Sequence, residues 1–394
     1  MKLAHLADAH LGCRQFGRQD EHGVNQREAD VAAAFRAAID AVISRACDAV
    51  VIAGDLFHSV RPTNRSIIEA FSQLARLRAA LPAAPVVLIA GNHDTPRSAE
   101  SGSILKLMAS LGVDVVDESP RRLDYPALGL SVLAVPHAAL LGGGGDRPWR
   151  VDPAAHHNVL VMHPEVAGLF PDMGVTDYGG VRVEAEELTR EPWTWVALGH
   201  YHVVTRVAER VWYSGSLEYT SPDIWGERRA ELRDGVAKGI LLADLETGAV
   251  ERVPLPPGRA VHDLPRLDAS GMSPPELDAA IAGRIAGIAG GLAGTVTRLV
   301  VDNVPRPLAH ALDHGAIRAL KAQALHFHLD LRRPEPTRRA VGVGGPGTRV
   351  TLGDVVADYL GRRPLDAELD RSRLVALGRE YLDLVERALA EGEA

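Results

Sequence analysis

The sequence predicts an α/β fold in which buried parallel strands alternate with amphipathic helices. Five short apolar runs occur in the first 202 residues, at 2–7, 50–53, 86–90, 159–162 and 196–198. Between the early runs, apolar side chains recur at helical spacing. This alternation is the pattern of βαβ units, which build sheets of parallel strands with helices on their faces. We therefore expect a layered α/β domain at the N-terminal end of the chain.

Three covering helices are predicted by apolar stripes at spacings of three and four residues. The stripes are Val31, Phe35, Ile39, Val42 and Ile43, then Ile67, Phe71, Leu74 and Leu77, then Ile104, Leu105, Met108 and Leu111. All three helices should cover the sheet. Ile68 lies beside the second stripe and Leu107 beside the third, so either helix could also face a partner.

Each apolar run ends in residues that can ligate a metal ion. The runs lead, in order, into Asp8 and His10, Gly54-Asp55, Gly91-Asn92-His93-Asp94, His163, and Gly199-His200-Tyr201-His202. In open α/β sheets, ligands bind outside the carboxyl ends of the strands. We therefore expect these side chains to converge on one crevice.

The set of donor groups indicates a pair of metal ions. Carboxylates, imidazoles and one amide, with no thiolate, suit hard or borderline ions such as manganese, iron, magnesium or zinc. Two ions roughly 3.5 to 4 Å apart can share a carboxylate and hold both oxygens of an in-line phosphoryl displacement. Asp55, which follows the second run, is the natural bridge.

The ordered motifs resemble those of the calcineurin-like metallophosphoesterases, which are Asp-x-His, Gly-Asp, Gly-Asn-His followed by Asp or Glu, His, and Gly-His-x-His. All five occur here in order, each at the end of an apolar run. The resemblance implies an α/β sandwich of two sheets flanked by helices. It also implies a small α+β capping domain and a C-terminal helical tail.

The residues around the motifs resemble one branch of this superfamily, the DNA repair nucleases of the SbcD and meiotic-recombination-eleven type. The resemblance is carried by His5 to Gly12, Arg14-Gln15-Phe16, Gly54 to His58 with Arg61-Pro62, Tyr213 to Glu218, and Lys238-Gly239. It is strong up to about residue 245. It implies a manganese-dependent two-metal nuclease of double-strand-break repair with 3′ to 5′ exonuclease and endonuclease activity. The implied partners are DNA, a coiled-coil ABC-type ATPase subunit of the SbcC or Rad-fifty type, and a second copy of the chain.

The same resemblance implies a role for each site residue. It places Asp8, His10 and His202 on one ion, Asn92, His163 and His200 on the other, and Asp55 between the two. His93 would stabilise or protonate the departing sugar oxygen, and His58 would help to position substrate for exonuclease cleavage. The family commonly has Gly or Gln after the His of the fourth motif, whereas this chain has Pro164. His156 and His157 are therefore the alternatives to His163.

Net charge gives no global sign of nucleic-acid binding. The chain has 51 acidic and 43 basic residues and a net charge of −8, so phosphate contacts would come from local basic loops. The candidate DNA contacts are Arg14, Arg61 and Arg97, with Arg18 and Arg65 nearby.

Cysteine usage and the N-terminal pattern indicate the compartment. Cys13 and Cys47 are too few for a disulfide framework, which favours a reducing environment. The first apolar run becomes polar at Asp8 and His10, so no signal peptide is expected. We expect a soluble, cytoplasmic protein with no membrane partner.

Several conspicuous residues are expected to be structural. His5 lies inside the first run and His137 follows Pro136, so both are expected to be packed or surface histidines. Gly142 to Gly145 lack the Lys-Ser or Lys-Thr of a phosphate-binding loop and indicate a flexible loop. His326 and His328 alternate with apolar residues, as in a strand with one solvated face.

The second half of the chain has a different organisation. We expect the nuclease domain to span residues 1–250, and a proline-rich connector at 254–258 to lead into a capping domain at 259–332. Ser273-Pro274-Pro275-Glu276 is a capping box that starts a helix. A strand at 296–301, a helix at 308–324 and a strand at 325–331 should complete this domain.

The C-terminal segment is predicted to bind a partner. Residues 333–349 indicate a flexible linker. Residues 350–394 contain predicted helices near 352–360 and 371–390, and the second carries an apolar stripe of Leu374, Leu377, Tyr381, Leu384 and Ala388. Such a stripe on a tethered helix favours docking on another surface. The resemblance implies the base of the ATPase coiled coil, and the alternative is that the helix folds back on the capping domain.

Two other functions are compatible with the motifs. One is a calcineurin-like phosphoesterase that acts on a cyclic nucleotide or a phosphoprotein. Phosphoprotein phosphatases usually have Gly-Asn-His-Glu and Gly-Asp-Tyr-Val-Asp-Arg, whereas this chain has Gly-Asn-His-Asp and Leu-Phe-His after Gly54-Asp55. The other is a non-catalytic scaffold for DNA ends, against which the intact ligand set argues.

Overall fold

The five apolar runs form strands in two six-stranded sheets. The computed structural model describes residues 1–96, 102–141, 149–169, 180–256, 258–334, 352–362 and 370–392. It contains two compact units, Met1–Arg332 and Arg333–Ala394. Each unit is described by itself.

The first sheet has the strand order β14-β13-β1-β2-β3-β4, and the second has the order β11-β12-β10-β7-β6-β5. The first contains β1 (Lys2–Leu6), β2 (Ala49–Ile52), β3 (Val86–Ile89), β4 (Asp114–Val116), β13 (Gly239–Asp244) and β14 (Val250–Pro254). The second contains β5 (Arg121–Tyr125), β6 (Leu130–Val135), β7 (His157–Met162), β10 (Trp195–Leu198), β11 (Thr205–Ala208) and β12 (Val211–Tyr213). The two sheets confirm the predicted sandwich.

Strand pairing explains why the motif-bearing strands end close to one another within each sheet. β1 is parallel to β2, with Leu3 opposite Ala49, and β2 is parallel to β3. In the other sheet β7 is parallel to β10, with Val159 opposite Trp195. Three of the motif-bearing strands therefore end together in one sheet, and two end together in the other.

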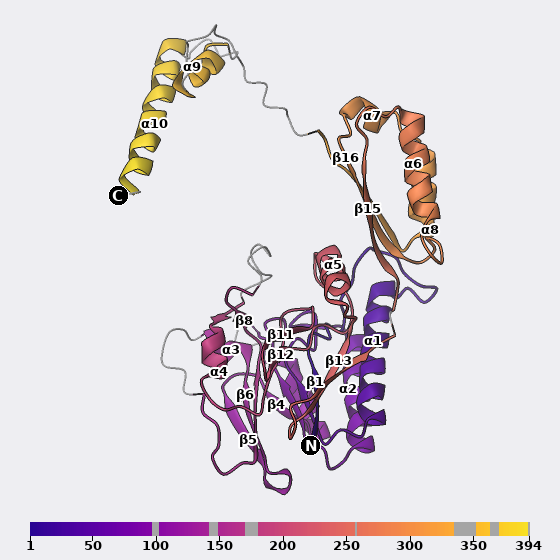
Figure 1. The fold of residues 1–394 in the computed structure, drawn as a ribbon, viewed down its shortest axis with the longest axis vertical. Coiled ribbons are helices and arrows are strands. Elements are labelled where there is room, and N and C mark those ends of the chain that lie inside the picture. The colour runs from indigo at the N-terminus through magenta and orange to yellow at the C-terminus, as the bar shows by residue number, and fades with distance from the viewer. Residues whose placement is uncertain are drawn as a thin grey trace. The chain divides into compact units, whose positions relative to one another are not determined.

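Alternating side chains of these strands build separate cores. Leu3 and Ala7 of the first sheet join Val159 and Trp195 of the second in the core between the sheets. Leu6 points to the other face and packs with residues of α1 (Gln26–Ser44) and α2 (Asn64–Ala80). Figure 1 shows α1 and α2 on one side of the sandwich, and α3 (His137–Leu141) and α4 (Ala185–Thr189) on the other. A two-stranded sheet of β8 (Glu165–Val166) and β9 (Arg182–Val183) lies beyond β7.

The predicted third helix forms with a different winding. Ile104–Leu111 is a 3₁₀ helix, η2, and not an α-helix. Leu105 and Met108, three residues apart, are fully buried. A 3₁₀ helix places residues three apart on the same side. This winding therefore allows Leu105 and Met108 to be buried together in a short segment. A second 3₁₀ turn, η3, spans Pro126–Leu128.

Residues after 258 form a small α/β layer with its own core. Its parallel sheet has the order β15-β16-β17, formed by Val261–Asp268, Val296–Asp302 and His326–Leu331. The capping box at Ser273 starts α6 (Pro274–Ala286), as predicted. The predicted helix at 308–324 is wrong as one element, because α7 (Arg306–His310) ends and Asp313 caps a new helix, α8 (His314–Gln323).

This layer packs on the sandwich within the first unit. Tyr219 and Trp225, the latter on α5 (Ile224–Asp234), share a buried apolar cluster with Val261, Val296 and Leu325. Phe16 stacks on His326 with ring centroids 4.1 Å apart. The division into domains at 1–250 and 259–332 stays a prediction, since both parts belong to the unit Met1–Arg332.

The second unit contains α9 (Leu352–Arg362) and α10 (Arg371–Gly392), at the positions predicted for two helices. Tyr359 of α9 is 61% exposed and Tyr381 of α10 is 63% exposed. The structure does not describe residues 335–349 of the predicted linker, Gly142 to Gly145, or the side chains of Leu384 and Ala388. None of the described helices is both long and apolar enough to cross a membrane.

Candidate metal centre

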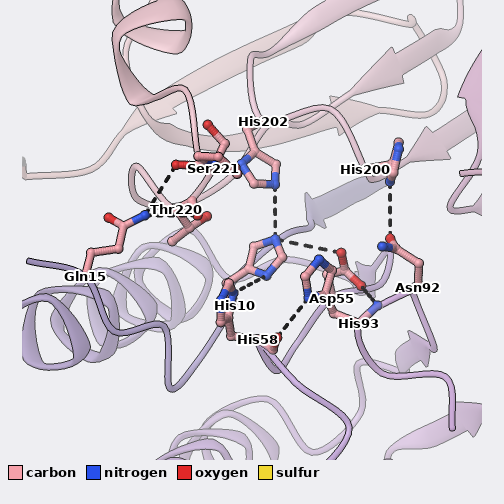
Figure 2. A pocket seen from close by; sticks show the side chains of 11 residues that line it. His10, Gln15, Asp55, His58, Asn92, His93, His200, His202, Thr220 and Ser221 are labelled. Atoms are coloured by element: carbon pink, nitrogen blue, oxygen red, sulfur yellow. Dashed lines mark hydrogen bonds and ion pairs between the residues drawn. The ribbon is translucent and has the colours of Figure 1, made fainter. Parts of the chain in front are cut away.

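Residues that follow β1, β2, β3 and β10 line one cavity of about 240 Å³, and His163, which follows β7, lies 3.0 Å from Asn92 in that lining. Six of the predicted site histidines and carboxylates line it, and Figure 2 shows them pointing toward one another. The lining includes His10, Asp55, His58, Asn92, His93, His200 and His202. The convergence expected from the sequence is therefore present.

Strained backbone occurs at several of the predicted ligand residues. Asp8, His10 and Asp55 have φ angles of 52°, 48° and 52°, and His200 has φ of 107°. These left-handed conformations are uncommon for residues with a Cβ and cost on the order of 1–3 kcal/mol each. Their concentration at four of the seven predicted ligands indicates that the fold maintains this strain for the geometry of the site.

Glycines before the ligands allow the loops to approach closely. A Cβ on Gly91 would lie 2.1 Å from Oδ1 of Asp55, and a Cβ on Gly199 would lie 2.0 Å from the carbonyl oxygen of Ala53. Real Cβ atoms do not come so close, so the motif glycines are required by packing.

One group of donors contains Asp8, His10 and His202. Their ligand atoms all lie within 4.8 Å of one another. Nε2 of His10 is 3.0 Å from Nε2 of His202 and 3.7 Å from Oδ2 of Asp55. Two imidazole nitrogens that each lie about 2.1 Å from one ion at a right angle would be about 3.0 Å apart. The spacing therefore fits two ligands of one ion.

A second group contains Asn92, His163 and His200. Oδ1 of Asn92 is 3.0 Å from Nε2 of His163 and 3.2 Å from Nδ1 of His200. Nε2 of His163 is also 3.2 Å from Oδ2 of Asp55. Asp55 thus reaches both groups with the same carboxylate oxygen, as a bridging ligand would.

His163 lies inside this second group, whereas its two alternatives do not. His156 and His157 contact Glu246, at the beginning of β7 and not at its end. Pro164 therefore does not displace the side chain of His163 from the second donor group.

Electrostatics in the centre reflect several ionisable groups buried together. Asp8 and His163 are fully buried, and Asp55 is 2% exposed. Burial raises the pKa of Asp8, while the neighbouring His163 and His10 outweigh burial and hold the pKa of Asp55 well below its usual range. Burial opposes the charged form of His163, but Asp55 outweighs it and raises the pKa of His163 to about 9. Buried carboxylates are costly unless they pair with cations, so the donor set and its charge fit divalent ions.

Hydrogen bonds to Nδ1 fix the imidazole rings of His163 and His202. Nδ1 of His163 donates to the carbonyl oxygen of Ala53 at 2.7 Å, which leaves Nε2 directed at Asn92 and Asp55. Nδ1 of His202 lies 3.2 Å from Oε1 of Glu227 on α5. Partners of this kind set the tautomer of a metal-binding histidine and raise its basicity.

Glu227 belongs to a buried network that sequence reasoning missed. Lys238 donates to Glu227, to the carbonyl oxygen of His202 at 2.8 Å and to Oγ of Ser216 at 2.9 Å. Lys238 outweighs burial and lowers the pKa of Glu227 to about 2. Two acidic residues four apart on α5, Glu227 and Glu231, are both 2% exposed. The sequence gives only a weak signal that Glu227 and Glu231 are buried, because charged residues on the exposed face of a helix are also commonly four residues apart.

Asp94 is a second missed residue, although its motif was recognised. Its carboxylate accepts from the backbone N–H groups of Leu56 at 3.1 Å, Phe57 at 3.0 Å and Gly91 at 3.2 Å. Burial, with Asp55 nearby, raises the pKa of Asp94 to about 7. Asp94 therefore joins the second motif loop to the third.

His93 and His58 lie at the cavity beside the two donor groups. The backbone N–H of His93 donates to Oδ1 of Asp55 at 2.9 Å, and its Nδ1 donates to the carbonyl oxygen of His58 at 2.8 Å. His10, His58 and His93 also lie close enough to hold an ion. That trio contains no carboxylate, and Nε2 of His10 already faces His202, so the first donor group fits a divalent ion better.

The candidate arginines differ in whether their guanidinium groups already contact other groups of the protein. Nε of Arg14 is 2.7 Å from Oε2 of Glu28, and Arg18 donates to the carbonyl oxygens of Lys321 and Ala322. Arg61 is exposed just before α2. Arg97 lies outside the described residues.

Comparison with known proteins places this geometry among phosphoesterases. Residues 1–204 match the calcineurin-like phosphoesterase family. The chain is 29% identical over 270 residues to the DNA double-strand break repair protein Mre11 of Archaeoglobus fulgidus, which covers 61% of this chain and 57% of the relative. It is 26% identical over 249 residues to Mre11 of Sulfolobus acidocaldarius, covering 62% of this chain and 60% of the relative. The matched region thus spans less than two thirds of these relatives.

Proposed function

Because the chain belongs to the calcineurin-like phosphoesterase family, we propose that it is a two-metal nuclease that hydrolyses phosphodiester bonds of DNA. The observation that carries the proposal is the shared carboxylate of Asp55, with one oxygen 3.2 Å from His163 and 3.7 Å from His10. Two divalent ions held in this way would supply an activated water and neutralise charge on the phosphoryl group.

In the proposed site, Asp8, His10 and His202 would hold one ion, and Asn92, His163 and His200 would hold the other. Glu227 and the carbonyl oxygen of Ala53 orient the rings of His202 and His163. These contacts keep the ligand nitrogens directed at the cavity before substrate arrives.

His93 is the proposed proton donor to the departing sugar oxygen. Its Nδ1 is held by the carbonyl oxygen of His58, so its Nε2 carries the second proton when the ring is charged and can deliver it. A positioned acid of this kind contributes about 10²- to 10⁴-fold in rate. His58, which stacks on His93 with ring centroids 5.3 Å apart, is proposed to position the nucleotide for exonuclease cleavage.

DNA is proposed as the substrate because the matched relatives are described as DNA double-strand break repair proteins. The net charge of −8 and the pairing of Arg14 with Glu28 favour binding of the DNA phosphates mainly through the metal ions. Exposed residues such as Arg61 would add further phosphate contacts. Manganese as the metal, 3′ to 5′ exonuclease and endonuclease action, and a role for residues 259–332 as a DNA-binding cap belong to the same proposal.

The proposed protein partners are supported by exposed apolar side chains. Ile68 is 64% exposed on α2 and Leu107 is 42% exposed on η2, which suits a contact between two copies of the chain. In the second unit, Val355, Tyr359, Leu377 and Tyr381 are exposed. We propose that residues 350–394 dock on a coiled-coil ATPase through these exposed side chains.

The proposal is tested by assaying manganese-dependent cleavage of single-stranded DNA, double-stranded DNA ends, a cyclic nucleotide and a phosphopeptide in parallel. Cleavage of DNA alone, abolished by chelation, is the expected result. Preferential turnover of the cyclic nucleotide or phosphopeptide would support another phosphoesterase. DNA binding without turnover of any substrate would support a scaffold.

A further inference from the structure

Two histidines and a glutamate meet at the end of the sandwich opposite the candidate metal centre. Nε2 of His157 is 2.9 Å from Oε1 of Glu246, and Nε2 of His156 is 3.2 Å from Oε2 of the same carboxylate. One ligand atom from each of the three residues lies within 4.8 Å of the others. None of the three contributes to the proposed nuclease mechanism.

The position of this cluster separates it from the nuclease centre. β7 begins at His157 and ends at Met162, next to His163. A strand rises about 3.3 Å per residue, so His157 and His163 are on the order of 20 Å apart along the chain. Glu246 follows β13, whose last residue Asp244 pairs with Lys2 at the start of β1. The cluster therefore joins the far ends of both sheets.

The backbone holds the three side chains in place. The N–H of His157 donates to the carbonyl oxygen of Gly129 at 2.9 Å, which anchors the start of β7. His156 precedes the strand, outside the alternation of the pleat, so adjacent side chains can reach one carboxylate. On the other side, Oδ1 of Asp244 accepts from the N–H groups of Glu246 at 2.9 Å and Thr247 at 3.0 Å, which fixes the turn.

Exposure and protonation are suitable for a metal ligand set. The side chain of His157 is 4% exposed, whereas His156 and Glu246 are 71% and 53% exposed, so solvent can complete the coordination. Neutral imidazole is the form of histidine that ligates metals. Two imidazoles and a carboxylate suit zinc and its first-row neighbours.

We propose that His156, His157 and Glu246 form a transition-metal site, with zinc as its probe, that joins the two sheets. Glu246 is 90 residues from His156 and 89 from His157 in sequence, so the complete ligand set exists only in the folded chain. An ion that binds the native state and not the unfolded chain stabilises it by mass action. The site thus acts as a structural clip at the end of the sandwich that carries no nuclease chemistry.

Equilibrium dialysis against buffered free zinc tests the site on the full chain. We compare the wild type with His156→Ala and Glu246→Gln. His22→Ala is the matched control, because His22 is similarly exposed and lies 3.5 Å from Glu21, but has no second imidazole in its pair. The expected result is one zinc equivalent fewer per chain in His156→Ala and Glu246→Gln, and no loss in His22→Ala.

Thermal unfolding supplies a second measurement. Zinc should raise the melting temperature of the wild type and His22→Ala more than that of the two site variants, each protein being compared with its own melting temperature in chelator. Equal zinc content in all four proteins would overturn the proposal and leave only hydrogen bonds between these residues. The test uses the difference in zinc content between the wild type and each variant. The result therefore does not depend on how many ions bind at the proposed nuclease centre.

Discussion

Removing the charge of Glu227 should weaken metal binding without touching a ligand. In Glu227→Gln, the amide replaces the carboxylate that holds Nδ1 of His202 at 3.2 Å. The imidazole keeps an acceptor but loses a charged one, so it becomes less basic and less firmly oriented. We expect lower affinity for the ion held by Asp8, His10 and His202.

The magnitude follows from this one contact. A hydrogen bond to a charged group contributes about 1.5–3 kcal/mol, and loss of an outer partner of a metal ligand costs about 10- to 100-fold in affinity. Because glutamine retains an acceptor, we expect the lower end, about 10-fold, which is about 1.4 kcal/mol.

Glu231→Gln is the matched control for this experiment. Glu231 lies on the same helix, is also 2% exposed, and also contacts Lys238, at 3.4 Å. It hydrogen-bonds the hydroxyl of Tyr219, and no contact between it and His202 is present among the described residues. A general disturbance of the buried network should therefore affect both variants equally.

Calorimetric manganese titration of the wild type and both variants measures the effect, with melting temperatures in chelator as the control for folding. Glu227→Gln should bind one ion about 10-fold more weakly, while Glu231→Gln should bind like the wild type. Equal manganese affinity in the two variants would refute the positioning role of Glu227.

Three further predictions follow from other parts of the structure. His93→Gln should retain bound manganese and DNA affinity but cleave about 10²- to 10⁴-fold more slowly; loss of metal from this variant in elemental analysis would make His93 a ligand. Burial lowers the pKa of His5 to about 3, outweighing its hydrogen bond to Leu198. The unfolded chain therefore binds one more proton than the native state between pH 6.5 and about 3, and stability should fall by about 1.4 kcal/mol per unit as the pH drops. His5→Leu should flatten that slope in urea titrations, and an unchanged slope would contradict the assignment. Deletion of residues 350–394 should abolish co-purification with the coiled-coil ATPase but preserve manganese-dependent cleavage of single-stranded DNA, whereas a marked drop in melting temperature would favour packing on the cap.

The side chains that lie together in the candidate metal centre could be selected from the sequence because each motif is a local pattern. An apolar run that ends in Asp8, Asp55 or His163 can be recognised without knowing which strands are neighbours. The structure adds that β1, β2 and β3 belong to one sheet and β7 and β10 to the other. The proposed shared position of Asp55 depends on this arrangement.

The supporting contacts were not predictable in the same way. Glu227 reaches His202 only because α5 packs under the fifth motif, and Asp94 reaches Leu56 and Phe57 only because two loops meet. The edge strand β15, which contains Pro265, was also not predicted. Proline is tolerated at such an edge because its missing N–H is not required by a neighbouring strand.

The break between α7 and α8 has a local cause that the prediction of one helix at 308–324 did not include. Asp313 accepts from the N–H groups of Gly315 and Ala316 at 2.9 Å and starts a new helix. Asp within a continuous helical pattern is a weak signal for such a cap, because its alternative is an ordinary exposed position.

The central claim is that one carboxylate, Asp55, holds two metal ions that cleave DNA. Counting bound manganese by titration in the wild type and Asp55→Asn, beside a cleavage assay on the same samples, tests it most directly. The wild type should bind two ions per chain in the nuclease centre, and Asp55→Asn should lose the pair and all cleavage while its circular dichroism spectrum is retained. Undiminished manganese-dependent cleavage by Asp55→Asn would contradict the two-metal site.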